Sequence, residues 1–501
     1  MLRPCLARCP ELLGVLMSTN DVHELAAVNS PAQSAHTGAV IGAGPNGLAA
    51  AITLAQRNFH VDVFEAQPQP GGAARTLELT QPGFLHDFGS AVHPLAAGSP
   101  FFSSLPLQSY GLEWIHSPAP LAHPFDDGTA ITLERNLRDA ESILAPDGNR
   151  WRALMQPLAE HWPALSAEIL RPLNVFTSHP FLLARLGLTA FLPTKTLVHI
   201  FRGERTKALF AGLAAHSFLS LDEPLSAAFG IILAAAAHAV GWPIPRGGAQ
   251  SITKSLCAHL ASLGGSVKTS ALIEDVSALE NYDAILCDVT PHQLLRIARN
   301  HFPTRFARKL AKYRYGPGVF KVDYALHHPI PWKSADCARA ATVHLGGSFQ
   351  EIAASEYDMR HGRHSDRPFV LLAQPSLFDP TRAPAGKHIA WAYCHVPNSS
   401  TVDMLQTLES QIERFAPGFR DCILARRVFS PRALEDMDAN LIGGDISGGA
   451  ADLRQFFFRP TWRHYITPIR NLYICSSSTP PGGGVHGMCG HNAAKQAASR
   501  L

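Results

Sequence analysis

Three glycines, at positions 42, 44 and 47, have the spacing in this sequence with the clearest chemical use. Residues 38–41 before them are short, apolar and β-branched at the end, which predicts a buried parallel strand. Residues 48–56 after them contain no helix breaker and predict a helix. Gly42 allows a tight turn, Gly44 allows phosphates to approach the backbone, and Gly47 allows the helix to pack closely on the strand. The free N–H groups and the positive dipole end of such a helix predict an anion-binding turn.

A carboxylate follows the next predicted strand. Residues 60–65 form this strand and end at Glu65, which can accept hydrogen bonds from both hydroxyls of a ribose. Strand, glycine-rich turn, helix, strand and acid within one short unit predict a dinucleotide site. Ala43, Pro45, Asn46 and Ala66 belong to the same turn and strand end and are assigned to this site. The alternative is a glycine-rich turn that only opens a core helix.

A second glycine-rich segment follows Glu65 and reads Gly71-Gly72-Ala-Ala-Arg75-Thr76. It resembles the segment past the ribose-binding acid in the FAD superfamily that includes amine oxidases and phytoene desaturases. The resemblance implies that Gly71, Gly72, Arg75 and Thr76 meet the FAD phosphates. Arg75 stands two residues further from the glycine pair than in the amine oxidases, and the alternative for it is a surface charge.

The same resemblance distributes further FAD contacts along the chain. Gly89 and Ser90 would lie where the backbone passes the flavin ring. Ile273, in an expected strand over residues 271–276, would bond the adenine through its backbone. A formal GxGxxG over residues 482–487 leaves too little chain for a second dinucleotide unit. A helix N-terminus at Gly487 and Met488 would instead stabilise negative charge on the pyrimidine end of reduced flavin.

Catalytic candidates come partly from the same resemblance. Lys321, in a predicted strand over residues 319–324, matches the amine-oxidase lysine that holds a water against flavin N5. Such a lysine could transfer protons or assist flavin reoxidation, and its alternative is a solvated lysine on a strand edge. His93 is a candidate for the cavity lining, with a structural histidine as the alternative. His486 and His491 are weaker acid/base candidates.

Length and resemblance together predict the domain organisation. A chain of 501 residues exceeds the size of a single core. The phrases PGGAART, YGPGVFKVDYAL, PIPW and GGGVHGMCGHNAA resemble a bacterial and mitochondrial branch of the phytoene-desaturase-like proteins. The expected fold is α/β: a discontinuous Rossmann-like FAD-binding domain (37–100, 241–291 and 471–501) with an α+β substrate domain (101–240 and 292–470). Residues 1–36 are expected to form a disordered extension.

Composition excludes several classes of protein. A formal charge of +3 without a Lys/Arg run argues against nucleic-acid binding. The nine cysteines include no CxxC pair, which argues against a disulfide framework, a zinc ribbon and a dithiol reductase. His361 and His364 have loose metal spacing but no carboxylate companion, so a solvated loop and no metal are expected.

Two apolar stretches bear on membranes. Residues 224–245 carry no charge and are long enough to span a bilayer, but their alanine-rich composition favours a buried core helix. Residues 181–192 are interrupted by Arg185, and a core position is favoured over a surface that meets lipid or a greasy substrate. The N-terminal residues form only a weak transit peptide. The expected location is cytoplasmic, with peripheral membrane contact left open, or the mitochondrial matrix if the source is eukaryotic.

The expected function is an FAD-dependent oxidoreductase that transfers hydride from an apolar, carotenoid- or lipid-like substrate to flavin N5. FAD would be bound non-covalently, and oxygen, a quinone or NAD(P) would reoxidise it. A flavin amine oxidase is the first alternative, although the sequence shows no obvious aromatic cage or acid cluster for a charged amine. The second alternative is a non-enzymatic, FAD-stabilised scaffold that regulates a membrane respiratory complex.

Overall fold

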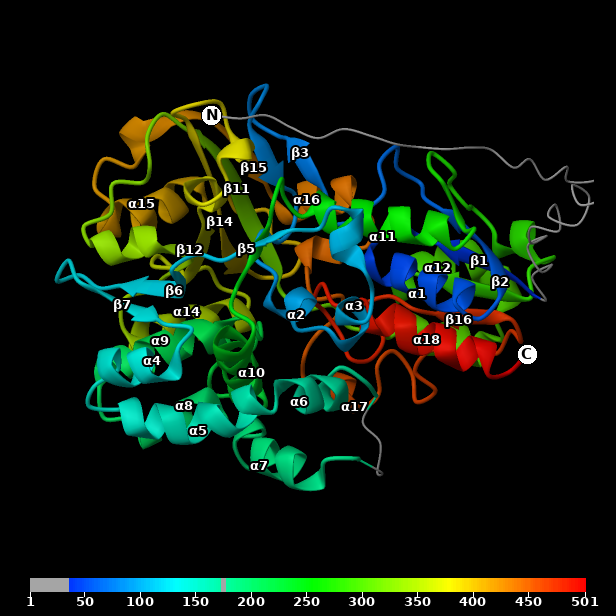
Figure 1. Ribbon diagram of the computed structural model, residues 1–501, viewed down its shortest axis with the longest axis horizontal. Helices are drawn as coiled ribbons and strands as arrows, with labels where there is room; N and C mark the ends of the chain where they lie inside the picture. The colour runs from blue at the N-terminus through cyan, green and yellow to red at the C-terminus, as the bar shows by residue number, and fades with distance from the viewer. Residues whose placement is uncertain (1–35, 173–176) are drawn as a thin grey trace, which may run out of the picture.

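The computed structural model describes residues 36–172 and 177–501, and Figure 1 shows its two larger sheets toward opposite ends of the long axis. The N-terminal extension expected from the sequence lies outside the described residues up to residue 35, as do Cys5 and Cys9. His36, which was assigned to that extension, instead begins the first strand because its backbone pairs with Phe59.

The strands of the described chain are β1 (His36–Ile41), β2 (Phe59–Phe64), β3 (Thr76–Glu78), β4 (Leu85–Asp87), β5 (Trp114–Ile115), β6 (Ala119–Pro124), β7 (Ala130–Leu133), β8 (Ile244–Pro245), β9 (Ser266–Lys268), β10 (Ala284–Cys287), β11 (Gly318–Leu326), β12 (Ala340–Leu345), β13 (Val370–Ala373), β14 (His388–Val396), β15 (Ile423–Phe429) and β16 (Leu472–Ile474). The α-helices are α1 (Pro45–Ala55), α2 (Pro94–Ala97), α3 (Pro100–Ser103), α4 (Leu137–Ile143), α5 (Gly148–Glu160), α6 (Trp162–Ile169), α7 (Pro180–Ala190), α8 (Thr194–Leu197), α9 (Glu204–Ala215), α10 (Ser226–Ala239), α11 (Gln250–Ser262), α12 (Pro291–Ala298), α13 (Thr304–Ala311), α14 (Phe349–Arg360), α15 (Leu405–Phe415), α16 (Pro431–Met437), α17 (Leu453–Phe457) and α18 (Met488–Ala498).

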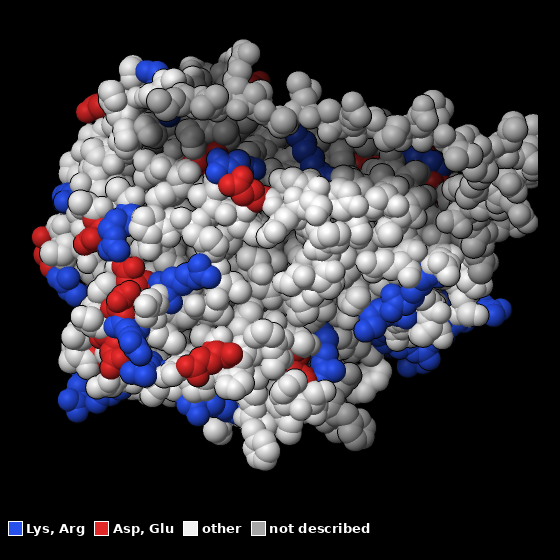
Figure 2. All heavy atoms as spheres, viewed as in Figure 1, with Lys and Arg blue, Asp and Glu red and all other residues white. Residues whose placement is uncertain are grey.

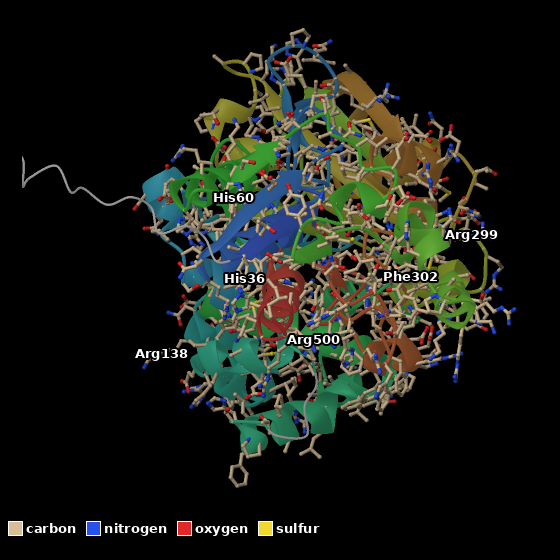
Figure 3. All side chains as sticks on the ribbon, turned by 90° about the vertical axis from the view of Figure 1, so that its right-hand side faces the viewer. His36, His60, Arg138, Arg299, Phe302 and Arg500 are labelled. Atoms are coloured by element: carbon tan, nitrogen blue, oxygen red, sulfur yellow. The ribbon has the colours of Figure 1, made fainter. Side chains whose placement is uncertain are left out.

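A five-stranded sheet has the order β16-β10-β1-β2-β9, and all its neighbouring strands run parallel. Alternate residues of each strand point to opposite faces. Val40 and Leu286 pack with α1, α11 and α18, whereas Ala39 and Ile285 pack with α12 and α13. Figure 3 shows His36 of β1 and His60 of β2 on the left of the view, and Arg299 and Phe302 on its right. Helices therefore cover both faces, as parallel strands require.

A seven-stranded sheet has the order β15-β11-β14-β13-β12-β6-β7. Its pairs are antiparallel except for β12 with β6. On one face, Phe320 and Val322 of β11 pack with Leu408 and Ile412 of α15. Residues of opposite parity, such as Val319, pack on the other face with α9 and α10. Because β11 lies between β14 and β15, it is an interior strand, and its side chains on this second face have a neighbouring strand on both sides.

The strand expected over residues 271–276 is wrong. β9 ends at Lys268, and Ser270 then adopts a left-handed conformation with φ +52°. The amide of Ala271 donates to the carbonyl of Glu65 at 2.8 Å, so the chain crosses the end of β2 instead of extending the sheet. Ile273 consequently lies in a loop beside the carboxyl ends of the parallel strands.

The two apolar stretches differ in exposure. α10 is buried over most of its surface, which confirms the core helix predicted within residues 224–245. The core position favoured for residues 181–192 is wrong, because in α7 Phe181 is 91% exposed and Leu188 is 79% exposed. Only Leu186 and Ala190 of α7 are buried, since this helix lies on the outside of the helical layer. Among the described residues, no single helix is long and apolar enough to cross a membrane; α7 with Thr194–Ile200 passes that test only as a pair bent by 96°.

Candidate cofactor and substrate site

A cavity of about 1230 Å³ joins the carboxyl ends of β1 and β10 to the α9 and α10 face of the larger sheet. Of the residues that the sequence assigned to the cofactor, the cavity is lined by Gly42, Gly44, Pro45, Asn46, Glu65, Ala66, Gly72, Arg75, Gly89, Ser90 and Ile273. The three catalytic candidates His93, Lys321 and His486 also line it. Segments that are far apart in the sequence therefore share one cavity.

The glycine-rich turn has a separate physical need for each glycine. Gly42 has φ +99°, which a side chain rarely adopts. A Cβ on Gly47 would lie 2.0 Å from the carbonyl oxygen of Gly42, so helix α1 could not pack as it does. Gly44 is extended (φ −70°, ψ 173°), and a Cβ there would meet only the Asp288 carboxylate, at 2.9 Å. The backbone conformation at position 44 therefore does not require glycine. The absence of a side chain there leaves space in the cavity wall for a ligand.

Glu65 lies at the end of β2 with both carboxylate oxygens fixed by the backbone. Oε2 accepts from the amide of Ala43 at 2.8 Å, and Oε1 accepts from the amide of Gln67 at 2.9 Å. Each oxygen keeps further acceptor capacity, and the side chain lines the cavity. This arrangement fits a carboxylate that accepts from ribose hydroxyls.

Asp288 is a cavity residue that the sequence analysis did not identify. It follows β10, lines the cavity, and accepts from the amide of Gly47 at 2.7 Å. Burial raises the pKa of Asp288 to about 7, and the charges of Asp438 and Glu65 act in the same direction. A signal was available, because Asp288 follows the apolar residues of β10 directly, as Glu65 follows β2. The protonation state of this carboxyl therefore changes near neutral pH.

Arg75 is buried on the cavity wall rather than solvated at the surface. Its Nε donates to the carbonyl of Gly72 at 2.7 Å, and one terminal nitrogen donates to the carbonyl of Met437 at 3.0 Å. The guanidinium also lies 5.2 Å from the ring centre of Phe88. These contacts hold a permanent positive charge beside the glycine-rich turn.

Six residues that the sequence assigned to the cofactor lie behind the cavity wall: Ala43, Gly47, Gly71, Thr76, Gly487 and Met488. Ala43 and Gly47 fix Glu65 and Asp288 through their amides. The Thr76 hydroxyl donates to Asp87 at 2.8 Å, and Asp87 forms a buried ion pair with Arg382 at 2.7 Å. Thr76 therefore positions the chain around β3 and β4 instead of facing the cavity.

The start of α18 is packed in the core. A Cβ on Gly487 would lie 2.6 Å from the ring of Phe102, and Met488 belongs to the apolar cluster between α1 and the parallel sheet. The cavity wall in this region is formed by residues 482–486 instead. The cavity is therefore lined by the residues just before Gly487 and not by Gly487 and Met488, which the resemblance implied.

Lys321 is buried and forms an ion pair with Asp323. Its Nζ lies 5.6 Å from the ring centre of Trp391 and 5.5 Å from that of Phe429. Burial raises the pKa of Asp323 to about 6 despite the adjacent ammonium. The alternative of a solvated lysine on a strand edge is wrong, because β11 is an interior strand and this face is closed by α9 and α10.

His93 and His486 face the cavity as neutral imidazoles. Burial lowers the pKa of each to about 4. Nε2 of His93 has no hydrogen-bond partner within the described ranges, whereas Nδ1 of His486 accepts from the amide of Met488 at 3.1 Å. His491 contacts Thr53 at 2.9 Å between α1 and α18 and does not line the cavity.

The other half of the cavity is mostly apolar. Its walls include Leu183, Leu186, Phe191, Phe218, Leu225, Phe229, Ile232, Leu233, Trp242, Val319 and Leu371. Trp391 and Tyr393 of β14 add two stacked rings, 5.6 Å apart and inclined by 9°. The sequence analysis did not identify this pair, although the spacing of two residues on a strand places both rings on one face.

Metal and disulfide chemistry have little support in the described part of the chain. No group of three or more His, Cys, Asp or Glu residues there could hold a metal ion. His361 bonds the carbonyl of Tyr357 at 2.8 Å, and His364 bonds the hydroxyl of Ser400 at 2.7 Å. The cysteines between residues 36 and 501 are unpaired.

Comparison with known proteins agrees with this geometry. Residues 40–102 match the family model of an NAD(P)-binding Rossmann-like domain. The chain is 25% identical to a lycopene-forming phytoene desaturase of Pseudescherichia vulneris, over 90% of this chain and 96% of the relative. A Methanosarcina mazei oxidoreductase has the same fold (TM-score 0.61, 17% identity, 92% and 100% covered), as does a putrescine oxidase bound to putrescine (TM-score 0.56, 14% identity, 93% and 98% covered).

The chain is an oxidoreductase that is similar in sequence to phytoene and carotene desaturases and shares its fold with a putrescine oxidase. The likeness to the desaturases extends over about nine tenths of the chain, 90% for the phytoene desaturase and 89% for a zeta-carotene desaturase of Myxococcus xanthus. The chain is also similar to the pyridine nucleotide-disulfide oxidoreductase domain-containing protein 2 of Mus musculus, with 26% identity over 91% of this chain and 92% of the relative.

Proposed function

We propose that this oxidoreductase binds one FAD non-covalently, from the glycine-rich turn to the face of the larger sheet, and dehydrogenates an elongated apolar substrate. The observation that carries the proposal is the single cavity, which is polar at the parallel sheet and apolar beyond β11 and β14. When bound, FAD supplies a hydride acceptor at flavin N5. The chain's own residues bind FAD and the substrate, orient them and exclude water.

At the polar end, Glu65 accepts from the ribose hydroxyls. The N-terminus of α1 and the fixed cation of Arg75 bind the diphosphate. Ile273 lies near the adenine end, in the loop that crosses β2. Gly89 and Ser90 give the flavin ring a close approach to the backbone, and a Cβ on Gly89 would already lie 2.6 Å from the carbonyl oxygen of Ala73.

At the apolar end, the walls desolvate a carotenoid- or lipid-like chain, at roughly 25 cal/mol per Å² of apolar surface removed from water. Lys321 lies where the two halves meet and holds a buried proton donor beside the stacked rings of β14. His93 offers an unpaired imidazole nitrogen on the same wall. These two groups are the proposed sites for holding water or moving a proton.

The mouth surface consists of Phe181, Leu188, Phe191, Phe457, Phe458 and Trp462, and we propose that it meets a lipid bilayer. Trp462 is 74% exposed, and the ring of Phe191, just after α7, lies 6.4 Å from that of Phe456 in α17, so apolar rings of the two segments adjoin. Phe191, Phe457, Phe458 and Trp462 also line the cavity. Exposed apolar patches of this kind mark interaction sites, and a substrate dissolved in lipid would enter here. Figure 2 shows charged side chains in groups on the left and on the lower right of this view, and the part that projects at its lower edge, where Figure 1 draws α7, is white.

The first experiment is the visible spectrum of the purified protein, followed by release and identification of any chromophore. A flavin spectrum with FAD released on denaturation supports the proposal. Anaerobic bleaching by candidate donors then separates the alternatives: polyunsaturated hydrocarbons and lipids favour the desaturase-like activity, and primary amines favour an amine oxidase. A folded, colourless protein that FAD does not reconstitute would refute the cofactor assignment.

The same preparation tests the remaining choices. Oxygen, a soluble quinone and NAD(P)+ are offered in turn to the reduced protein, and the acceptor is the one that restores the oxidised spectrum. Bound FAD that no donor reduces would favour the scaffold. The amine oxidase keeps one structural argument, because Trp391 and Tyr393 present aromatic surface beside the cavity.

A further inference from the structure

Two histidines meet at the apolar end of the cavity and have no part in the function described so far. His216 follows α9 and lines the cavity, and His344 lies on β12 behind it. Their Nε2 atoms are 3.0 Å apart, a hydrogen-bond distance. Burying a polar pair of this kind costs free energy unless each donor and acceptor has a hydrogen-bond partner. The ring nitrogens of the pair that have no partner therefore indicate where a ligand could bind.

Strand register fixes where this pair lies relative to Lys321. Lys321 is opposite Tyr393, Tyr393 is opposite Leu371, and Leu371 is opposite His344. The four residues form one row across β11, β14, β13 and β12. Three strand spacings separate Lys321 from His344, a backbone distance of roughly 14 Å. An elongated molecule that reacts beside Lys321 therefore extends toward His216.

Packing around His344 determines how the pair shares its protons. Nδ1 of His344 has no hydrogen-bond partner among residues 36–172 and 177–501. The atom faces Gly212, where even a Cβ would lie 2.7 Å from it, so no acceptor can approach. A buried N–H group without a partner costs more free energy than a buried unprotonated nitrogen without one. Nδ1 of His344 is therefore unprotonated, and Nε2 carries the proton. His344 then donates to Nε2 of His216.

His216 lines the cavity and is left with one donor. Burial lowers the pKa of His216 to about 3, so the ring is neutral at pH 7. With Nε2 accepting from His344, the proton of His216 is on Nδ1, for which no described residue is a partner. The ring of Trp242 packs edge-on against the imidazole at 5.8 Å and holds its orientation. Phe218 and Leu225 also line this end, so a pure hydrocarbon would leave the donor unpaired.

We infer that the apolar end of the cavity binds a hydrogen-bond-accepting oxygen of the substrate, with His216 donating through Nδ1. The ligand class is an elongated apolar molecule with a carbonyl, carboxylate or hydroxyl oxygen at the end remote from the reacting carbon. This inference rests on the proposed function, because it requires that the cavity takes an apolar chain. His344 is a positioning residue in this scheme, since it sets the tautomer of His216.

The test uses decan-2-one, isotopically labelled at the carbonyl, and difference infrared spectroscopy of the full-length protein. The carbonyl stretch should move to lower wavenumber on binding, because a donor contacts the oxygen. His216→Phe removes the donor and should abolish the shift, with decanone affinity reduced about three- to tenfold, the value of one neutral hydrogen bond. His216→Asn places an amide N–H near the former Nδ1 and should restore the shift. His238→Phe is the matched control, because His238 is buried on Trp151 and away from the cavity.

The hydrocarbon 1-decene separates this inference from the proposed function. It should bind wild-type protein and His216→Phe equally. If decanone and decene both bind the wild type but the carbonyl band does not move, the role of His216 is overturned while the apolar cavity stands. If neither probe binds, the proposed substrate site and this inference fail together. Should His216→Phe not fold, an unmoved carbonyl band in the wild type still overturns the inference.

Discussion

Replacing Gly44 with alanine separates the stability of the fold from the binding of its cofactor. The backbone of Gly44 is extended and accepts any L-residue. The added Cβ would meet only Asp288, with Oδ2 at 2.9 Å and Cγ at 3.9 Å. A carboxylate can shift by a few tenths of an ångström, and alanine also lowers the entropy of the unfolded chain by about 0.4–1 kcal/mol. The free energy of unfolding should therefore change by less than about 1 kcal/mol.

FAD binding should respond quite differently. The methyl group would occupy the space in the cavity wall where the diphosphate is proposed to lie. Overpacking of a tight contact costs about 1–3 kcal/mol, which corresponds to roughly a 5- to 150-fold loss of affinity. The assay is titration of the cofactor-free protein with FAD by fluorescence quenching, together with thermal unfolding of the same sample.

Gly187→Ala is the matched control. Gly187 lies within α7, and a Cβ there would meet only the Phe191 ring, at 4.0 Å. This variant should bind FAD as the wild type does. Unchanged FAD affinity in Gly44→Ala would refute the placement of the diphosphate. A large loss of stability before any FAD is added would refute the reasoning about the backbone.

Three further predictions test other parts of the site. FAD affinity should rise as the pH falls through about 7, because the neutral form of Asp288 does not repel a diphosphate. Asp288→Asn should flatten this pH dependence in the same titration. A wild-type FAD affinity that does not change with pH would contradict the prediction. Lys321→Met should lower the free energy of unfolding by about 3–5 kcal/mol, because Asp323 is left buried without its ion pair. Adding Asp323→Asn should recover much of that loss in denaturant unfolding, and an unchanged midpoint in the single variant would count against the buried pair. The double variant Phe181→Ser/Trp462→Ser should float less with phosphatidylcholine/phosphatidylglycerol vesicles than the wild type, while its circular dichroism spectrum stays unchanged. Flotation equal to that of the wild type would argue against the mouth surface as a lipid contact.

Local signals explain which parts of the molecule were predictable. The unit from β1 to Glu65 is a contiguous stretch of chain, and each of its glycines has a local reason. The burial of α10 follows from a composition that is apolar all round. The failed strand over residues 271–276 has a non-local cause, because the amide of Ala271 pairs with the carbonyl of Glu65 some two hundred residues earlier in the chain.

The sequence by itself therefore determined the dinucleotide turn, its acid and the class of fold, since these depend on neighbours along the chain. Tertiary structure decided which side chains face the cavity. In the folded chain Thr76 donates a hydrogen bond to Asp87, and Asp288 accepts one from the amide of Gly47. Gly487 is packed against the ring of Phe102. Tertiary structure also aligned Lys321 and His344 in one row across four strands. Strand order and helix packing set these positions, and no local pattern in the chain encodes which distant strands become neighbours.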